Sequence, residues 1–184
     1  MSRIILDLCG GTGSWSKPFA DGGGYDVRVI DLKTGQDVRL FEKPKERIYG
    51  ILAAPDCTHF AGSGARWWEQ KGIGPLLEGL AVVDACLRIV VACQPKFWAL
   101  ENPIGRLTRY LGPPKMYFNP CDYGDAYTKK TALWGNFNPP KQTPVEPTEG
   151  SKLWRMYGGK SERTKTMRSI TPPGFANAFF EANK

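Results

Sequence analysis

Cys57 is the residue whose type and position best suit nucleophilic chemistry. It lies in ILAAPDCTHFAG (51–62), where an apolar run typical of a buried strand gives way to small and polar residues. A thiolate is a strong nucleophile, but a lone cysteine more often packs as a small apolar residue. The residues that follow, through Ala65, are rich in glycine and alanine, as in a loop that closes over a substrate. Residue type alone leaves both roles open for Cys57.

Glu101 is the second candidate, because it follows another apolar run, FWAL (97–100). Burial of a carboxyl group favours its protonated form, which can donate a proton to a substrate. If the two apolar runs are neighbouring parallel strands, Cys57 and Glu101 lie at the same edge of the sheet. The alternative is a glutamate that caps a loop or forms an ion pair, and Glu101 on its own fits that alternative better.

A glycine turn in DLCGGTGSW (7–15) is the third candidate. Glycines between a strand and a helix let the backbone approach a ligand closely, and the helix start offers unpaired N–H groups. G-G-T-G differs from the dinucleotide pattern G-x-G-x-x-G, so the ligand need not carry phosphate; a nucleoside with a charged amino-acid tail would fit. Asp31 ends the next apolar run, where an acid can accept hydrogen bonds from ribose hydroxyls. The alternative is a tight turn without a ligand.

Alternating strands and helices are expected to position these residues. Apolar runs predict strands over 3–9, 25–32, 49–54 and 97–100, and helices are predicted over 14–21 and 75–93. Short strands within 116–124 and 131–137 predict an antiparallel edge, and a last helix is predicted after Pro172-Pro173. We therefore expect an α/β fold, a doubly wound and mostly parallel sheet of the Rossmann-like type, with ligands at the carboxyl ends of its strands.

Length and composition favour one globular domain over residues 1–184, since 41% of the chain is hydrophobic. No apolar run is long enough for a membrane helix and no secretory leader is recognisable, so a soluble cytoplasmic protein is expected. The five cysteines are scattered and form no C-x-x-C pair. Neither a disulfide framework nor a metal site is expected.

The charge favours a polyanionic partner, because 25 lysines and arginines against 18 acids give a formal net charge of +7. Basic residues gather in 141–168, within a proline-rich stretch over 139–170 that is predicted to be an extended loop. This loop is either a solvated surface or a surface that contacts phosphates.

Several segments, in order, resemble the motifs of the cytosine-C5 DNA methyltransferases. DLCGGTGSWS (7–16) resembles the first motif, D-L-F-x-G-x-G-G-F-S. The others are PDCTHFA (55–61) for P-P-C-Q-x-F-S, ENP (101–103) for E-N-V, YTKK (127–130) for the basic Q-x-R-x-R, and TPPGFA (171–176) for V-P-P-x-x-A. Asp31 matches the acid that ends the family's second strand. Asp37-Val38 matches the acid-aliphatic pair that follows the family's third strand. On this match, the strand before Cys57 is the fourth. The resemblance runs from Asp7 to Phe180.

The resemblance implies a function and a site. Cys57 would add to C6 of cytosine and a protonated Glu101 would hold the base, while C5 takes a methyl group from S-adenosyl-L-methionine (AdoMet). Residues implied to hold AdoMet are Asp7, Gly11, Gly13, Trp15, Asp31, Asp37, Val38, Pro55 and Thr171. Residues expected to contact nucleic acid are Asn102, Lys129, Lys130 and Arg66. In duplex DNA the target base would have to be flipped out.

The chain departs from the family at three places. Asp56 replaces a proline beside Cys57, and Lys129-Lys130 replaces arginines that could form planar bidentate contacts. Only the extended basic loop over 139–170 stands in place of a target-recognition domain, so sequence readout is expected to be short, relaxed or supplied by a second subunit. Two alternatives stay open: the same chemistry on RNA or a free cytosine nucleotide, or a non-catalytic protein that binds AdoMet or nucleic acid.

Overall fold

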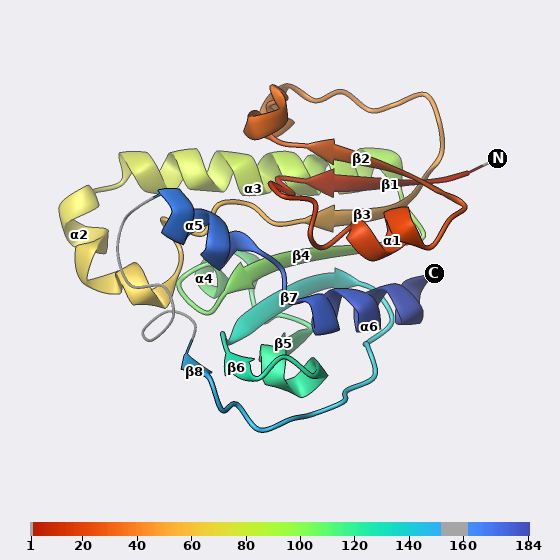
Figure 1. The fold of residues 1–184 in the computed structure, drawn as a ribbon. Coiled ribbons are helices and arrows are strands. Elements are labelled where there is room, and N and C mark those ends of the chain that lie inside the picture. The colour runs from red at the N-terminus through yellow and green to blue at the C-terminus, as the bar shows by residue number, and fades with distance from the viewer. Residues whose placement is uncertain (1, 152–161) are drawn as a thin grey trace.

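The computed structural model of the chain describes residues 2–151 and 162–184 and has a six-stranded sheet at its centre (Figure 1). The strand order is β2-β1-β3-β4-β7-β5. The strands are β1 (Arg3–Leu8), β2 (Tyr25–Ile30), β3 (Ile48–Ala53), β4 (Phe97–Pro103), β5 (Met116–Phe118) and β7 (Thr131–Asn136). β1 to β4 are parallel, whereas β7 runs antiparallel to β4 and to β5. The predicted mostly parallel sheet with an antiparallel edge is confirmed.

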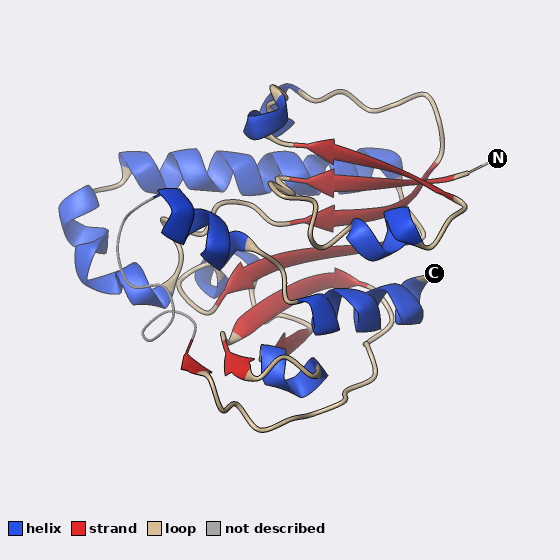
Figure 2. Cartoon of the chain, viewed as in Figure 1, coloured by secondary structure: helices blue, strands red, loops and turns tan. Residues whose placement is uncertain are grey.

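Helices cover both faces of the sheet, as Figure 2 shows. The long helix α3 (Gly74–Cys93) packs on one face with a core of aliphatic side chains that includes Leu6, Ile51 and Leu100. Helices α1 (Lys17–Asp21) and α6 (Pro173–Asn183) lie on the other face, where the core is largely aromatic. Short helices α2 (Trp68–Lys71) and α4 (Thr108–Leu111) complete the connections. Alternate residues of each buried strand serve the two cores, which explains the nearly continuous apolar runs.

The parallel register brings four strand ends to one edge. Leu8 is opposite Ile30 of β2 and Ala53 of β3, and Ala53 is opposite Leu100 of β4. The glycine turn, Asp31, the Cys57 loop and Glu101 therefore follow adjacent positions along the carboxyl edge. This is the edge at which open α/β sheets bind their ligands.

Two local expectations need correction. Asp37-Val38 does not follow a third strand: the residues between β2 and β3 form the 3-10 helices η1 (Leu32–Thr34) and η2 (Val38–Leu40), so Cys57 follows β3, the third strand. Asp37 accepts a hydrogen bond from the Arg39 N–H at the start of η2, and this polar cap favours a helical turn over a strand.

The stretch 139–170 is only partly the extended loop that we expected. Residues 139–149 lack regular structure apart from a turn, but Gly150–Ser151 form β8, which pairs with β6 (Tyr127–Thr128), and Glu162–Ser169 form helix α5. Helix α5 was missed because its polar sequence has no apolar stripe. The part of this prediction that falls on 152–161 lies outside the described residues. Within the described residues, no helix combines the length and apolarity that crossing a membrane requires.

Candidate active site

The structure brings Cys57, Glu101 and Lys129 together at the carboxyl edge. Cys57 follows β3, Glu101 lies in β4, and Lys129 lies between β6 and β7. The Lys129 ammonium nitrogen is 3.8 Å from Glu101 Oε1, and both side chains are largely buried. Lys129 Nζ also donates to the Arg168 carbonyl at 3.0 Å, which ties α5 to this cluster. A thiol, a carboxylate and an ammonium group thus share one site.

The electrostatic surroundings of Cys57 decide how readily its thiolate forms. Burial raises the pKa of the Cys57 thiol to about 11. The positive charge of Lys129 lowers this pKa, whereas the negative charges of Asp56 and Glu101 raise it. The free protein therefore holds a neutral thiol near neutral pH, and Lys129 is the group that favours the thiolate.

Asp56, which replaces the family's proline, folds back on its own loop. Its Oδ1 accepts hydrogen bonds from the Thr58 N–H at 2.8 Å and from the Thr58 hydroxyl at 2.6 Å. The exposed carboxylate thereby fixes the turn that carries Cys57. Such Asx turns are a common use of aspartate in loops. Asp56 thus orders the loop, at the cost of a negative charge near the thiol.

Asn102 and Pro55 join the two loops of the cluster. Asn102 is completely buried, and its Nδ2 donates to the Pro55 carbonyl at 3.0 Å. The structure thus places Asn102, which we expected to contact nucleic acid, in the interior at the junction of the two loops. Pro55 is likewise buried, and its carbonyl is the atom that Asn102 holds.

Backbone contacts beyond Asn102 extend this junction. The Gly62 N–H donates to the Ile104 carbonyl at 2.8 Å, and the Arg106 N–H donates to the Phe60 carbonyl at 2.9 Å. A Cβ at Gly105 would overlap the Phe60 carbonyl oxygen and lie 2.8 Å from the Gly62 nitrogen. Only glycine lets the loops after β3 and β4 approach this closely.

The two lysines of the basic motif take different positions. Lys129 is turned into the cluster beside Glu101, but the Lys130 ammonium lies 5.6 Å from the centre of the Tyr117 ring and its side chain is exposed. Successive residues of an extended segment point to opposite sides, which explains the division. Arg66 is also exposed, with its guanidinium 5.1 Å from the Trp67 ring centre.

The glycine turn is held by acids at both of its sides. Gly11 and Gly13 have positive φ angles of 55° and 68°. The Gly11 N–H donates to Asp31 Oδ2 at 2.9 Å, and Asp31 Oδ1 accepts from the Lys33 N–H at 2.8 Å. This places Asp31 directly against the turn, as expected for an acid that shares a ligand with it.

Asp7 lies beneath the turn rather than on its surface. It is completely buried, Ser16 Oγ donates to its Oδ2 at 2.5 Å, and a Cβ at Gly10 would overlap its carboxyl group. Burial raises the pKa of Asp7 to about 6, the Ser16 hydrogen bond opposes this, and the charge of Asp31 adds to it. Asp7 therefore supports the turn from below and does not reach its surface.

The remaining residues expected to hold AdoMet are divided between the site and the core. Thr171 is brought to the glycine turn, because its N–H donates a hydrogen bond to the Ser14 hydroxyl oxygen at 2.9 Å. Asp37 is bound to the Arg39 guanidinium, and hydrogen bonds from Arg39 lower the pKa of Asp37. Val38 is buried in the aliphatic core.

The ring of Trp15 is buried and is not accessible to a ligand. It is only 2% exposed and packs edge-on against Phe179 with ring centres 5.4 Å apart. It also contacts Phe175. The structure therefore gives Trp15 an anchoring role in the aromatic core in place of the adenine contact expected from the resemblance.

Three residues of the site were missed by the sequence interpretation. Ser14 and Ser16 hold Thr171 and Asp7, and Arg106 Nε donates to the His59 carbonyl at 2.7 Å. The serines could have been found, because hydroxyl residues just after a glycine turn commonly bond local backbone or side chains. Arg106 had no comparable local signal, since its partner lies 47 positions away in the chain.

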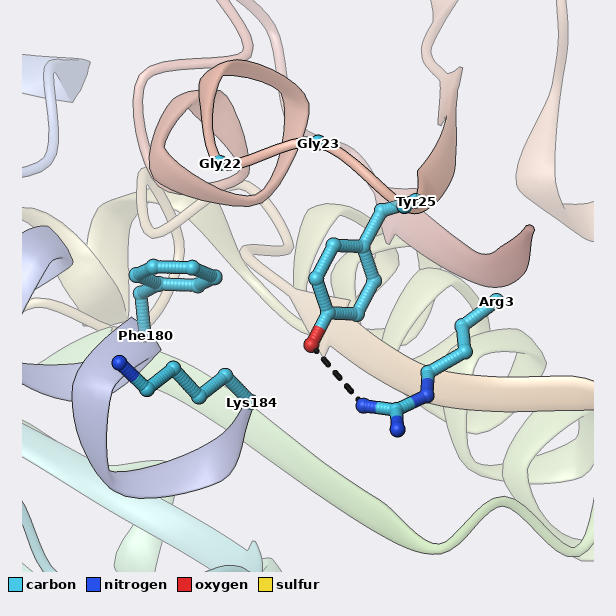
Figure 3. Close-up of a pocket in the computed structure, with 7 residues that line it drawn as sticks. Arg3, Gly22, Gly23, Tyr25, Phe180 and Lys184 are labelled. Carbon is cyan, nitrogen blue, oxygen red and sulfur yellow. Dashed lines mark hydrogen bonds between the residues drawn. The ribbon is translucent and has the colours of Figure 1, made fainter.

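A separate hollow lies at the amino-terminal edge of the sheet, away from this cluster (Figure 3). It is lined by Arg3, Gly22, Gly23, Gly24, Tyr25, Phe180 and Lys184. Arg3 Nη1 lies 3.3 Å from the Tyr25 hydroxyl in it. It holds neither a thiol nor a carboxyl side chain, so we place the candidate active site at the carboxyl edge. Among the described residues, no three His, Cys, Asp or Glu side chains are grouped as metal ligands would be.

Comparison with known proteins supports the fold. No protein-family model matches the chain, and no curated protein matches it. A solved structure that resembles it is that of a candidate DNA modification methyltransferase encoded within a prophage (E. coli), with a TM-score of 0.52 and 17% sequence identity. The match covers 99% of this chain and 70% of that chain. The chain therefore has an α/β, Rossmann-like fold that it shares with a methyltransferase structure.

Proposed function

We propose that residues 1–184 act as one catalytic domain that transfers a methyl group from AdoMet to C5 of cytosine in DNA, through a covalent adduct between Cys57 and C6. The observation that carries this proposal is the grouping of Cys57, Glu101 and Lys129 beside the glycine turn, in the order of the family's motifs. The shared fold with a DNA modification methyltransferase supports the class of reaction.

The residues of the glycine turn fit AdoMet. A Cβ added to Gly11 or Gly13 would have no neighbouring atom closer than 3.6 Å, so the turn offers an open backbone surface. Each Asp31 oxygen accepts one backbone N–H and keeps a lone pair that can accept a ribose hydroxyl. When bound there, AdoMet would supply an electrophilic methyl group. The turn, Asp31 and the Thr171 backbone would hold it beside the cytosine site.

The residues around Cys57 would perform the remaining steps. Cytosine C5 is a weak nucleophile until another nucleophile adds at C6, and a thiolate adds well and leaves again readily. Lys129 favours that thiolate. Glu101, fixed in β4, would donate a proton to N3 and accept a hydrogen bond from the exocyclic amine of the base. After methyl transfer, a base would remove the C5 proton, and the electrons of that C–H bond would expel the Cys57 sulfur as a thiolate.

DNA is the proposed polymer because the charge of +7 and the neighbour's assignment both favour it. RNA carries the same phosphate charge, so the substrates must be compared directly. Purified protein with labelled AdoMet is expected to label a cytosine-rich DNA. RNA of the same sequence and free cytidine nucleotides are expected to be labelled far less. Labelling of RNA or nucleotide in preference to DNA would overturn the choice of substrate.

Cys57→Ala tests the nucleophile. The variant is expected to lose methyl transfer entirely while AdoMet binding, measured by calorimetry, stays within about twofold of the parent, since the thiol does not belong to the glycine turn. Cys93→Ala is the matched control, because Cys93 is a free thiol at the far end of α3. Methyl transfer by Cys57→Ala at the rate of the control would rule out this nucleophile.

A further inference from the structure

Exposed apolar and aromatic side chains, accompanied by cations, lie on segments that adjoin the Cys57 loop, β4 and Lys129. Trp67 is 45% exposed beside Arg66, Tyr117 is 46% exposed beside Lys130, and Ile104 is 44% exposed. We call these five residues the aromatic rim. Large exposed side chains of this kind, gathered at one edge, mark an interaction surface.

Backbone hydrogen bonds join the segments that carry Trp67, Ile104 and Lys130 of the aromatic rim. The Gly62 N–H, at the start of the 3-10 helix η3 (Gly62–Trp67), bonds the Ile104 carbonyl, and the Ile104 N–H bonds the Lys130 carbonyl at 3.2 Å. Three segments far apart in the chain thus lie side by side. The first is joined to the Cys57 loop, because the Ala61 N–H donates to the Cys57 carbonyl at 2.9 Å. The aromatic rim therefore begins where the Cys57 loop ends.

The chemistry of the aromatic rim suits an unpaired nucleic-acid strand. Bases stack on exposed aromatic rings, and cations held over those rings attract the phosphates between the bases. A third pair of cation and aromatic ring follows nearby, since the Arg106 guanidinium lies 4.6 Å from the Trp68 ring centre. Lys71 is also exposed, and its ammonium group donates to the Thr58 carbonyl in the Cys57 loop. Asp56 and Glu69 are exposed acids close to these cations in the sequence.

Resting on the function proposed above, we propose that the preferred substrate is an unpaired DNA strand, which stacks bases on Trp67 and Tyr117 and delivers cytosine to Cys57. Stacking is tolerant of sequence, which agrees with the short stretch between Lys130 and Thr171 where recognition residues would otherwise lie. An unpaired cytosine also avoids the few kcal/mol that extraction from a duplex costs.

Binding of labelled oligonucleotides tests this proposal with the full chain. Fluorescence anisotropy would compare a single strand, its perfect duplex, and the same duplex with one unpaired cytosine. The single strand is expected to bind at least tenfold more tightly than the perfect duplex, with the interrupted duplex between them. Trp67→Ala and Tyr117→Ala are each expected to weaken single-strand binding by roughly 5- to 150-fold, the range for losing one stacked base. Trp67→Phe should recover most of the loss.

Arg3→Ala is the control for a substitution away from the aromatic rim, because Arg3 lies in the hollow at the opposite edge. Equal or tighter binding of the perfect duplex, tighter binding of single-stranded RNA than of DNA, or rim variants no weaker than Arg3→Ala would overturn the proposal. Failure of the proposed function looks different. If Trp67-dependent binding of the single strand is found without methyl transfer, the substrate inference stands and the methyltransferase fails. If methyl transfer is as fast on the perfect duplex as on the single strand, the methyltransferase proposal stands and the substrate inference fails.

Discussion

At the scale of single residues, Lys129 is the cation that favours the thiolate of Cys57. Burial holds the Cys57 pKa near 11 and Lys129 pulls it down, so Lys129→Ala should raise this pKa further. Each unit by which the pKa of the thiol rises lowers its thiolate fraction about tenfold, at a fixed pH below the pKa. We expect slower alkylation of Cys57 by iodoacetamide at pH 9, measured by peptide mass spectrometry.

Two variants separate the charge of Lys129 from its packing. Lys129→Arg keeps the charge and should alkylate close to the parent rate. Lys130→Ala removes a neighbouring charge whose side chain lies over Tyr117, so it should leave Cys57 unchanged. Equal alkylation rates in Lys129→Ala and Lys130→Ala would contradict the role given to Lys129.

Asp7 makes stability depend on pH. Its pKa of about 6 in the folded protein is above the ordinary value of 3.8, so ionisation costs more in the folded state than in the unfolded state. The free energy of unfolding should fall by about 3 kcal/mol as pH rises from about 4 to above 6. Asp7→Asn should lack this component. Urea unfolding of both proteins at pH 4.5 and 7.5 measures it, and identical pH dependence in the two would refute it.

At the scale of elements, the junction between the loops after β3 and β4 sets the geometry of the site. Gly105→Ala would drive a methyl group into the Phe60 carbonyl. We expect a loss of about 1 to 3 kcal/mol in the free energy of unfolding and a fall in methyl transfer of about a hundredfold, because small displacements of reacting groups are costly. AdoMet affinity should change little, since the glycine turn lies elsewhere on the edge.

Gly74→Ala is the control for this substitution, because a Cβ at Gly74 would meet nothing within 4 Å and its φ is not positive. It should keep parental stability or gain a few tenths of a kcal/mol at the start of α3. If Gly105→Ala behaves like Gly74→Ala in urea unfolding and in methyl transfer, the junction does not control the site.

The elements also explain what could be predicted from the sequence. Residues at the ends of adjacent parallel strands must meet at one edge, so the apolar runs before Cys57 and Glu101 were enough to predict their proximity. Burial of Trp15 and Asn102 was not predictable, because it depends on partners such as Phe179 and Pro55 that are remote in sequence. Helix α5 was missed because its residues carry no apolar periodicity.

At the scale of the whole molecule, the chain combines an α/β, Rossmann-like fold with a short stretch between Lys130 and Thr171. The Cys57 cluster and the glycine turn follow strands whose carboxyl ends the sheet register aligns (Figure 1), and backbone hydrogen bonds join segments of the aromatic rim to the Cys57 loop. Lys129 and Lys130 are adjacent in the chain, yet Lys129 lies beside Glu101 and Lys130 belongs to the aromatic rim. We infer that one edge of the sheet serves cofactor, chemistry and nucleic acid together.

Trapping the covalent intermediate tests this account most directly. The protein would be incubated with AdoMet and single-stranded DNA containing 5-fluorocytosine, whose fluorine cannot leave C5 as a proton does. We predict an adduct of protein and oligonucleotide, stable in denaturant and mapped by mass spectrometry to Cys57, that Cys93→Ala retains and Cys57→Ala loses. Protein that binds AdoMet and DNA yet yields no adduct, on single strand or duplex, would contradict the covalent mechanism.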